Sequence, residues 1–420
     1  DSGRGRRGRR GAPIAAMKRV FSKVHMATQG SLAGPTDPLP MALADPTRPC
    51  FLFGATPPRE GTDEVKAMEI AEKFVARARN LATDGYIVYD IQEEDGRTEL
   101  PRPFPFRRTL DPSAYGAMLS RASGKQAIIY KCAVGQSRQE YSEWLDTCVG
   151  KGPGKHGHSA INVVGGATSS KDYGGVTVPT ASEMCCARGV AIGGVTIAER
   201  HLTRIAAGKP GEHLNMQRKV DMGFQWFISQ AIYDASATVK LLQDYGRLCR
   251  ARGTTPKKVI LTFAPCGRAK TMTFIEWLGV LVPEDTKKAI LEADSPVATS
   301  VEILCGLLRT ILADAAGCGV PLGVSVESVS IFKEEIDAAE TLFRKTQQLL
   351  LDAQGTPWCV RWFHTGYNQM QVKAAADTYV VNGQPQKLVE VQRRQQGAIV
   401  EAVKLAAVSV FAFLLGRSKA

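Results

Sequence analysis

From residue 51 onward the chain alternates short apolar runs with longer stretches in which apolar residues recur at helical spacing. An apolar run of this length is typical of a buried parallel strand, and the stretch after it is typical of a helix packed on the sheet. Eight such pairs predict a (β/α)8 barrel, the TIM-barrel fold. We expect strands near 51–53, 86–91, 127–132, 159–164, 190–195, 224–230, 258–263 and 323–327. We expect helices near 64–79, 113–121, 138–148, 180–188, 212–222, 235–252, 271–318 (more than one helix) and 332–352.

The clearest strand lies in the middle of the chain and ends in polar residues. A helical stretch ends at Asp221, Gly223 follows where a left-handed residue would stop the helix, and Phe224–Ile228 is apolar. The strand then finishes with Gln230 and Asp234. Side chains at the carboxyl ends of parallel strands face the ligand in barrels of this class, so this end of the strand is a candidate site.

The same stretch resembles the methylenetetrahydrofolate reductase family, in its Arg-Lys-Val-Asp-x-Gly run, its Ser-Gln pair and its apolar triplet ending in Asp. Members of that family are FAD-containing (β/α)8 barrels that pass a hydride from NAD(P)H through the flavin to a folate. The resemblance extends over about 51–352 and is stronger in the second half.

The resemblance implies a set of binding residues. Arg218 and Lys219 would hold the FAD phosphates, and Gln230 would lie at both the flavin and the folate. Glu212 falls near an acidic FAD-contacting position, and Gly193 with the next glycine would leave the end of the fifth strand open to the cofactor. The alternative is a solvated helix face followed by a core strand.

The family's general acid is missing from the first strand. The family has a glutamate there, and this chain has Gly54, with the poor acid Thr56 nearby. No carboxylate lies between Asp45 and Glu60, so a shift in the alignment does not restore one. Proton delivery needs a titratable group within hydrogen-bond reach of the substrate, which predicts no confident catalytic residue in this strand.

Other positions that the family uses for the flavin and the folate are also replaced. A histidine of the third strand becomes Ile129, and an arginine and an aspartate after the fourth become Gly165 and Ala167. A folate-stacking aromatic residue becomes Ala269. Replacements on several strands favour a site that has lost its reductase chemistry.

The two ends of the chain differ from the barrel. The first 50 residues carry nine basic and three acidic side chains, so half of the net charge of +12 lies there. Residues 1–49 are interpreted as a basic targeting-like arm and linker, 50–355 as the barrel, and 356–420 as an extension that contacts a partner. The apolar run Leu405–Leu415 is too short to span a bilayer, which leaves packing on the barrel, a partner or the membrane interface. The arm predicts a mitochondrial protein, with plastid or cytoplasm as alternatives.

The remaining motifs indicate no second chemistry. The ten cysteines show no zinc-site spacing, so no metal is expected, and free thiols are favoured, with redox sensing at the adjacent Cys185 and Cys186 as an alternative. The glycine-rich loop around His156 and His158 lacks the spacing of a phosphate loop. His201 and His213 flank a loop where they could contact a phosphate. The mildly basic body argues against nucleic-acid binding.

Two hypotheses follow. The first is a methylenetetrahydrofolate-reductase-like barrel that has lost its chemistry and serves as an accessory subunit of a larger organellar assembly. The second is an active FAD-dependent, NAD(P)H-linked methylenetetrahydrofolate reductase or a related flavin oxidoreductase, in which case it binds folate.

Overall fold

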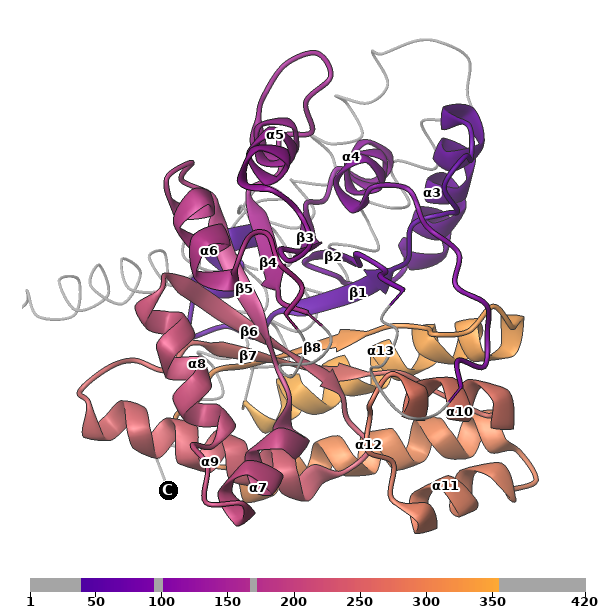
Figure 1. Ribbon diagram of the computed structural model, residues 1–420. Coiled ribbons are helices and arrows are strands. Elements are labelled where there is room, and N and C mark those ends of the chain that lie inside the picture. Colours follow the sequence, from indigo (N-terminus) through magenta and orange to yellow (C-terminus); the bar gives the residue numbers. More distant parts are fainter. Residues whose placement is uncertain (1–38, 94–100, 167–171, 355–420) are drawn as a thin grey trace, which may run out of the picture. The chain divides into compact units, whose positions relative to one another are not determined.

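Eight parallel strands close into a barrel in the computed structural model (Figure 1). The structure describes residues 39–93, 101–166 and 172–354. Each strand pairs with the next one along the chain, and the first pairs with the last, which closes the ring. The strands are β1 (Phe51–Ala55), β2 (Gly85–Val88), β3 (Ala127–Cys132), β4 (Ala160–Val164), β5 (Ala191–Thr196), β6 (Phe224–Ala231), β7 (Lys258–Phe263) and β8 (Leu322–Val326).

Helices cover the outside of the ring (Figure 1). They are α3 (Glu64–Ala78), α4 (Pro112–Ser123), α5 (Arg138–Val149), α6 (Val178–Cys186), α7 (Ala198–Ala206), α8 (Glu212–Asp221), α9 (Ala235–Ala251), α10 (Ala269–Trp277), α11 (Glu284–Leu291), α12 (Pro296–Asp314) and α13 (Lys333–Ala353). A further short helix, α2 (Leu39–Ala44), precedes β1. By length and composition alone α12 could cross a membrane, but it packs against α9 and α13 as part of the helical layer.

The predicted (β/α)8 barrel is confirmed, with all eight strands within three residues of their expected ends. The predicted helix stop is confirmed as well, since Gly223 has φ 96° between α8 and β6. That conformation is costly for any residue with a Cβ. The predicted basic arm and the C-terminal extension, including Leu405–Leu415, lie outside the described residues, so the domain boundaries stay predictions.

Two segments differ from expectation. Residues 39–44 form a helix where an extended linker is expected, because Leu39 and Leu43 are buried against the barrel. Residues 198–206 form α7 where a loop is expected. The region 271–318, expected to hold more than one helix, forms three, because Gly279 adopts φ 78° and Pro283 precedes α11.

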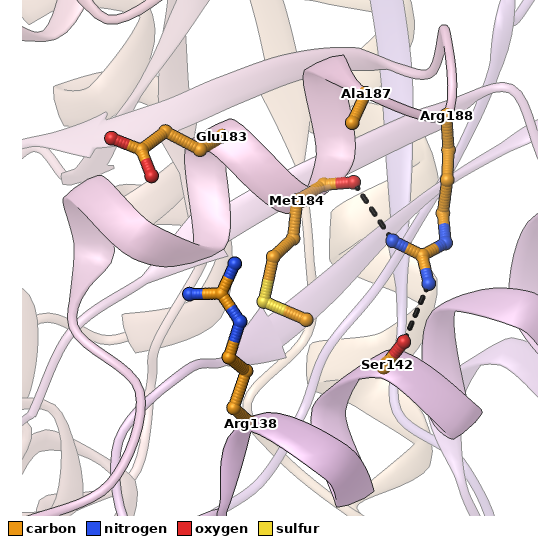
Figure 2. Close-up of a pocket in the computed structure, with 6 residues that line it drawn as sticks. All are labelled: Arg138, Ser142, Glu183, Met184, Ala187 and Arg188. Carbon is orange, nitrogen blue, oxygen red and sulfur yellow. Dashed lines mark hydrogen bonds between the residues drawn. The ribbon is translucent and has the colours of Figure 1, made fainter.

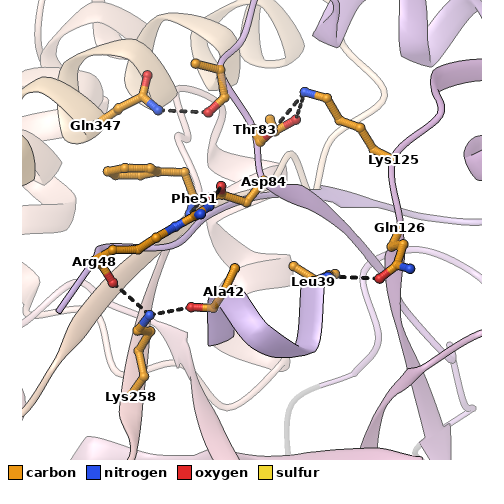
Figure 3. A network of polar contacts seen from close by, with 11 residues as sticks. Leu39, Ala42, Arg48, Phe51, Thr83, Asp84, Lys125, Gln126, Lys258 and Gln347 are labelled. Atoms are coloured by element: carbon orange, nitrogen blue, oxygen red, sulfur yellow. Dashed lines mark hydrogen bonds and ion pairs between the residues drawn. The ribbon is translucent and has the colours of Figure 1, made fainter. Parts of the chain in front are cut away.

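A short helix and a buried lysine seal the amino-terminal end of the barrel (Figure 3). Lys258, at the start of β7, is 2% exposed, and its Nζ donates to the carbonyl oxygens of Ala42 (2.6 Å) and Arg48 (2.8 Å). Burial lowers the pKa of this lysine. Asp84 accepts hydrogen bonds from the Phe51 backbone N–H and the Arg48 guanidinium, which fixes the chain that enters β1.

Replacing Lys258 with methionine is expected to lower the free energy of unfolding by about 2 kcal/mol, because two carbonyl groups lose their donor. Urea denaturation measures the change. Lys288→Ala, at an exposed position on α11, is the control and should change the free energy by less than about 0.5 kcal/mol. An unchanged midpoint in Lys258→Met would show that water replaces the ammonium group without cost.

Candidate functional site

A carboxyl group occupies the place at the barrel mouth where the first strand lacks one. Glu327 directly follows β8, and its backbone N–H donates to the Phe263 carbonyl oxygen (3.1 Å). A Cβ added at Gly54, in β1, would lie 2.7 Å from the Glu327 Cβ and 3.0 Å from Cε2 of Tyr89. A side chain at position 54 would therefore overlap Glu327 and crowd Tyr89, and glycine avoids this.

Tyr89 and Tyr130 line the same side of the mouth as Glu327. The Tyr89 hydroxyl hydrogen-bonds the Glu327 carboxyl group. The rings of Tyr89 and Tyr130 lie with their centroids 5.0 Å apart in an edge-on arrangement. Glu327 is partly exposed at the mouth, so a ligand can reach it.

Burial raises the pKa of Glu327, and the hydrogen bond from Tyr89 only partly offsets this effect. The pKa of Tyr89 is raised well above its usual value, first by burial and then by the neighbouring Glu327. The carboxyl group therefore stays protonated to higher pH than an exposed glutamate. A protonated carboxyl group can donate a hydrogen bond or a proton to a bound ligand.

Sequence reasoning missed this carboxyl group. The first strand has no acid, as the sequence shows, but the residue after β8 brings Glu327 beside Gly54 from 273 residues further along the chain. The available signal was the alternation of Ser325 and Glu327 at the end of the last strand, which places both on the inner face of a strand.

A second layer of polar residues lies inside the barrel at β4 to β6. In the strand register, Asn162 pairs with both Tyr130 and Gly193, and Gly193 pairs with Trp226. Asn162 and Trp226 are completely buried. Burial raises the pKa of the Tyr130 phenol, and the Asn162 amide lies close enough to its hydroxyl to oppose this rise. Neither this amide nor Nε1 of Trp226 has a hydrogen-bond partner of good geometry among the described residues. A buried polar group without a partner costs stability, so these atoms mark a place for water or a ligand.

The indole of Trp226 fills the space beside Gly193. A Cβ added at Gly193 would overlap Nε1, Cε2 and Cδ1 of that ring. The glycine was expected to leave the strand end open to a cofactor. The structure shows that the space admits a tryptophan of the neighbouring strand instead.

Gln230 lies at the end of β6, as expected for a ligand-facing residue. Its Nε2 donates to the Leu278 carbonyl oxygen at the end of α10 (2.8 Å), while its buried Oε1 has no partner among the described residues. β6 bulges here, and Ser229 accepts a hydrogen bond from the Thr262 backbone N–H (2.9 Å). A free amide oxygen at the mouth suits a hydrogen-bond donor of a ligand, and the substrate role of Gln230 stays a prediction.

The other three implied residues lie together on α8. Lys219 donates from Nζ to the Val195 carbonyl oxygen in β5 (2.6 Å). Burial lowers the pKa of Lys219, and the nearby Glu212 opposes this shift. Glu212 is 4% exposed, whereas Arg218 is exposed and donates to Oδ1 of Asn215 (3.0 Å).

These residues do not fit FAD in the way the resemblance implies. Lys219 is engaged by a backbone carbonyl, Gly193 is covered by an indole, and Ile129 and Gly165 bring no polar side chain. Ala167 lies outside the described residues. FAD binding through Arg218 and Lys219 stays a prediction that the geometry does not favour.

The two histidines after β5 are placed differently from the expected phosphate contact. His201 has no exposed surface, and its Nε2 lies 2.9 Å from Oδ2 of Asp244 on α9. The rings of His201 and His213 meet edge-on with centroids 5.0 Å apart. The expectation that His201 contacts a phosphate is wrong, because it packs between helices.

A surface hollow lies between α5 and α6 and has a volume of about 320 Å³ (Figure 2). Its Arg188 already donates to the Ser142 hydroxyl (2.6 Å), the Met184 carbonyl oxygen (3.1 Å) and Asp146 (2.8 Å). These bonds hold the two helices together. Among residues 39–93, 101–166 and 172–354, no group of three His, Cys, Asp or Glu side chains could hold a metal ion.

Comparison with known proteins connects this barrel to solved structures. No family model and no curated protein matches the sequence. The chain is similar to an uncharacterized protein from Clostridium thermocellum that binds two copies of 5-methyl-5,6,7,8-tetrahydrofolic acid. The two are 25% identical with a TM-score of 0.61, and the similarity covers 74% of this chain and 99% of that one. The shared fold is a (β/α)8 barrel.

Two structures of Xanthomonas albilineans dihydropteroate synthase also match. One holds indole-2-carboxylic acid and 6-chloroguanine, and the other holds 4-aminobenzoic acid. They are 15% and 13% identical, with TM-scores of 0.36 and 0.37, over 74% of this chain and 95% and 96% of theirs. At these TM-scores they add nothing to the assignment of the fold.

Proposed function

We propose that this protein binds a reduced folate at the carboxyl-terminal mouth of its barrel. The observation that carries the proposal is the Glu327–Tyr89 pair at that mouth, in a barrel that resembles a 5-methyltetrahydrofolate-binding protein over nearly all of that protein's length. The pteridine ring of a folate presents closely spaced donors and acceptors. Glu327, Gln230 and Asn162 offer matching groups at or below the mouth.

The proposal includes loss of the family's flavin chemistry. The support is the presence of Ile129 and Gly165 where the family has flavin-contacting side chains, together with the indole that covers Gly193. A barrel that binds folate without a flavin would bind or carry the ligand without reducing it.

Calorimetric titration of the full chain with 5-methyltetrahydrofolate tests folate binding. A dissociation constant on the order of micromolar is expected, which corresponds to about 8 kcal/mol. Arg138→Ala, in the surface hollow between α5 and α6, is the control and should bind as the unaltered chain does. Absence of binding at millimolar folate would refute the proposal.

A second candidate function is folate reduction through FAD and NAD(P)H, and one observation favours it. Glu327 supplies a carboxyl group of raised pKa at the position where the family needs its acid. A yellow purified protein whose flavin absorption is bleached by NADH or NADPH would establish this function. A colourless protein that binds folate would favour the first proposal.

The accessory role in a larger mitochondrial assembly is a further part of the proposal. Its support is the basic composition of residues 1–49 and the aromatic and apolar composition of 356–420. Cell fractionation followed by native electrophoresis tests it. Migration as a free monomer in the cytoplasm would contradict both the assembly and the location.

A further inference from the structure

The mouth of the barrel holds one carboxyl group whose surroundings select its protonated form. Glu327 enters the space left by Gly54, and the titratable groups that face it are the phenols of Tyr89, Tyr130 and Tyr233. The phenols come from the end of β2, β3 and the segment after β6, and β1 contributes only Gly54. A carboxyl group surrounded by neutral phenols gains little from ionising.

The hydrogen bond with Tyr89 orients this carboxyl group. Because the Tyr89 hydroxyl donates, one carboxyl oxygen serves as the acceptor. The second oxygen is left for the ligand, and it carries the proton when the group is neutral. Glu327 is partly exposed, so a ligand at the mouth can reach the residue.

We propose that Glu327 is the group that contacts the pteridine ring of the folate, and that it does so as a protonated acid which donates a hydrogen bond to a ring nitrogen. This inference rests on the proposed folate binding. It adds which residue contacts the folate, the protonation state of that residue and the kind of ligand atom that it contacts. The carboxyl group at this place of the mouth then comes from Glu327, at the end of the last strand, and not from position 54 of the first strand.

The sign of the pH dependence follows from this arrangement. Because the pKa of Glu327 is raised, the protonated donor is present below that raised value and disappears as the pH rises through it. Folate affinity is therefore expected to fall as the pH rises through the raised pKa of Glu327. The folate itself ionises in the same way with every variant. A difference in pH dependence between variants therefore reports the ionisation of Glu327.

Two substitutions separate a binding role from a structural one. Glu327→Gln keeps the shape, accepts from Tyr89 and still donates through its amide, so we expect affinity within about threefold of the unaltered chain at low pH, and the fall at high pH should disappear. Glu327→Ala removes the donor and should weaken binding of 5-methyltetrahydrofolate at least tenfold at low pH, where the unaltered chain has its donor, which is about 1.4 kcal/mol. The difference should shrink as the pH rises. Circular dichroism and thermal unfolding show whether each variant is folded.

The outcomes distinguish this inference from the proposed function. If the unaltered chain binds no folate, the proposed function fails and the inference fails with it. If it binds folate and Glu327→Gln keeps the same pH dependence, or a folded Glu327→Ala binds equally well, the inference alone fails. If neither variant folds, Tyr89→Phe decides, because it frees Glu327 without removing it. A changed pH dependence in that variant supports the inference, and an unchanged one overturns it.

Discussion

Replacing Gly54 with glutamate is expected to lower the free energy of unfolding by about 3 kcal/mol or more. The new Cβ would lie 2.7 Å from the Glu327 Cβ, closer than real Cβ atoms approach their neighbours, and 3.0 Å from the Tyr89 ring, which is a tight contact. Overpacking of this kind costs about 1 to 3 kcal/mol, and a second carboxyl group beside Glu327 adds to the cost. Chemical denaturation measures the change.

The matched control is Thr56→Glu, two residues further along. Thr56 is exposed, so the same charge is added without overlap, and the expected change is less than about 0.5 kcal/mol. Gly54→Ala should lie between the two, because it adds only the Cβ. Equal stability of Gly54→Glu and the unaltered chain would show that the mouth has room for two carboxyl groups.

The same substitution is not expected to create reductase activity. Gly54→Glu imitates the family's acid but displaces Glu327, and it leaves Ile129 and Gly165 in place of the side chains with which the family binds its flavin. Measurable NADH-dependent folate turnover in this single variant would contradict the loss of reductase chemistry.

Replacing Glu335 with alanine is expected to lower the free energy of unfolding by about 4 kcal/mol. Glu335, on α13, has no exposed surface and holds the segment after β7. Its Oε1 accepts from the backbone N–H groups of Gly267 (2.8 Å) and Arg268 (3.0 Å), and its Oε2 accepts from the Thr271 hydroxyl (3.0 Å). Hydrogen bonds to a carboxylate contribute about 1.5 to 3 kcal/mol each, and three donors, one of them the buried Thr271 hydroxyl, lose their acceptor.

Glu334→Ala tests the neighbouring residue on the same helix. Glu334 is exposed and forms an ion pair with Arg268 at 3.5 Å, so a change of less than about 1 kcal/mol is expected. Denaturation compares the two variants, and trypsin cleavage after Arg268 should be faster in Glu335→Ala alone. Similar stability of both variants would show that the loop is held by its own packing.

The pattern of apolar runs predicts the barrel because burial on both faces leaves a direct signature in a parallel strand. The glycine stop at Gly223 is predictable for a related reason, since a left-handed residue follows the helix directly. Local sequence does not predict α2. Its helix depends on Leu39 and Leu43 packing into the end of a barrel formed by distant residues.

For the candidate site too, some features are predictable from local sequence and others depend on distant residues. The sequence predicts that Gln230 lies at a strand end, because its position along β6 is a local property. It does not predict that Trp226 covers Gly193, since that contact depends on the register between two strands. The buried pairing of His201 with Asp244 likewise depends on how α7 packs on α9.

The order of strands and helices, the position of the strand ends and the absence of an acid from β1 are properties of the sequence by itself, because each depends on residues close together in the chain. Only the tertiary structure decides that a carboxyl group is nevertheless present beside Gly54. Closing the barrel brings β8 against β1, and this places Glu327 where the first strand has no side chain. Residues 273 positions apart become neighbours through closure of the ring, and no local pattern records that contact.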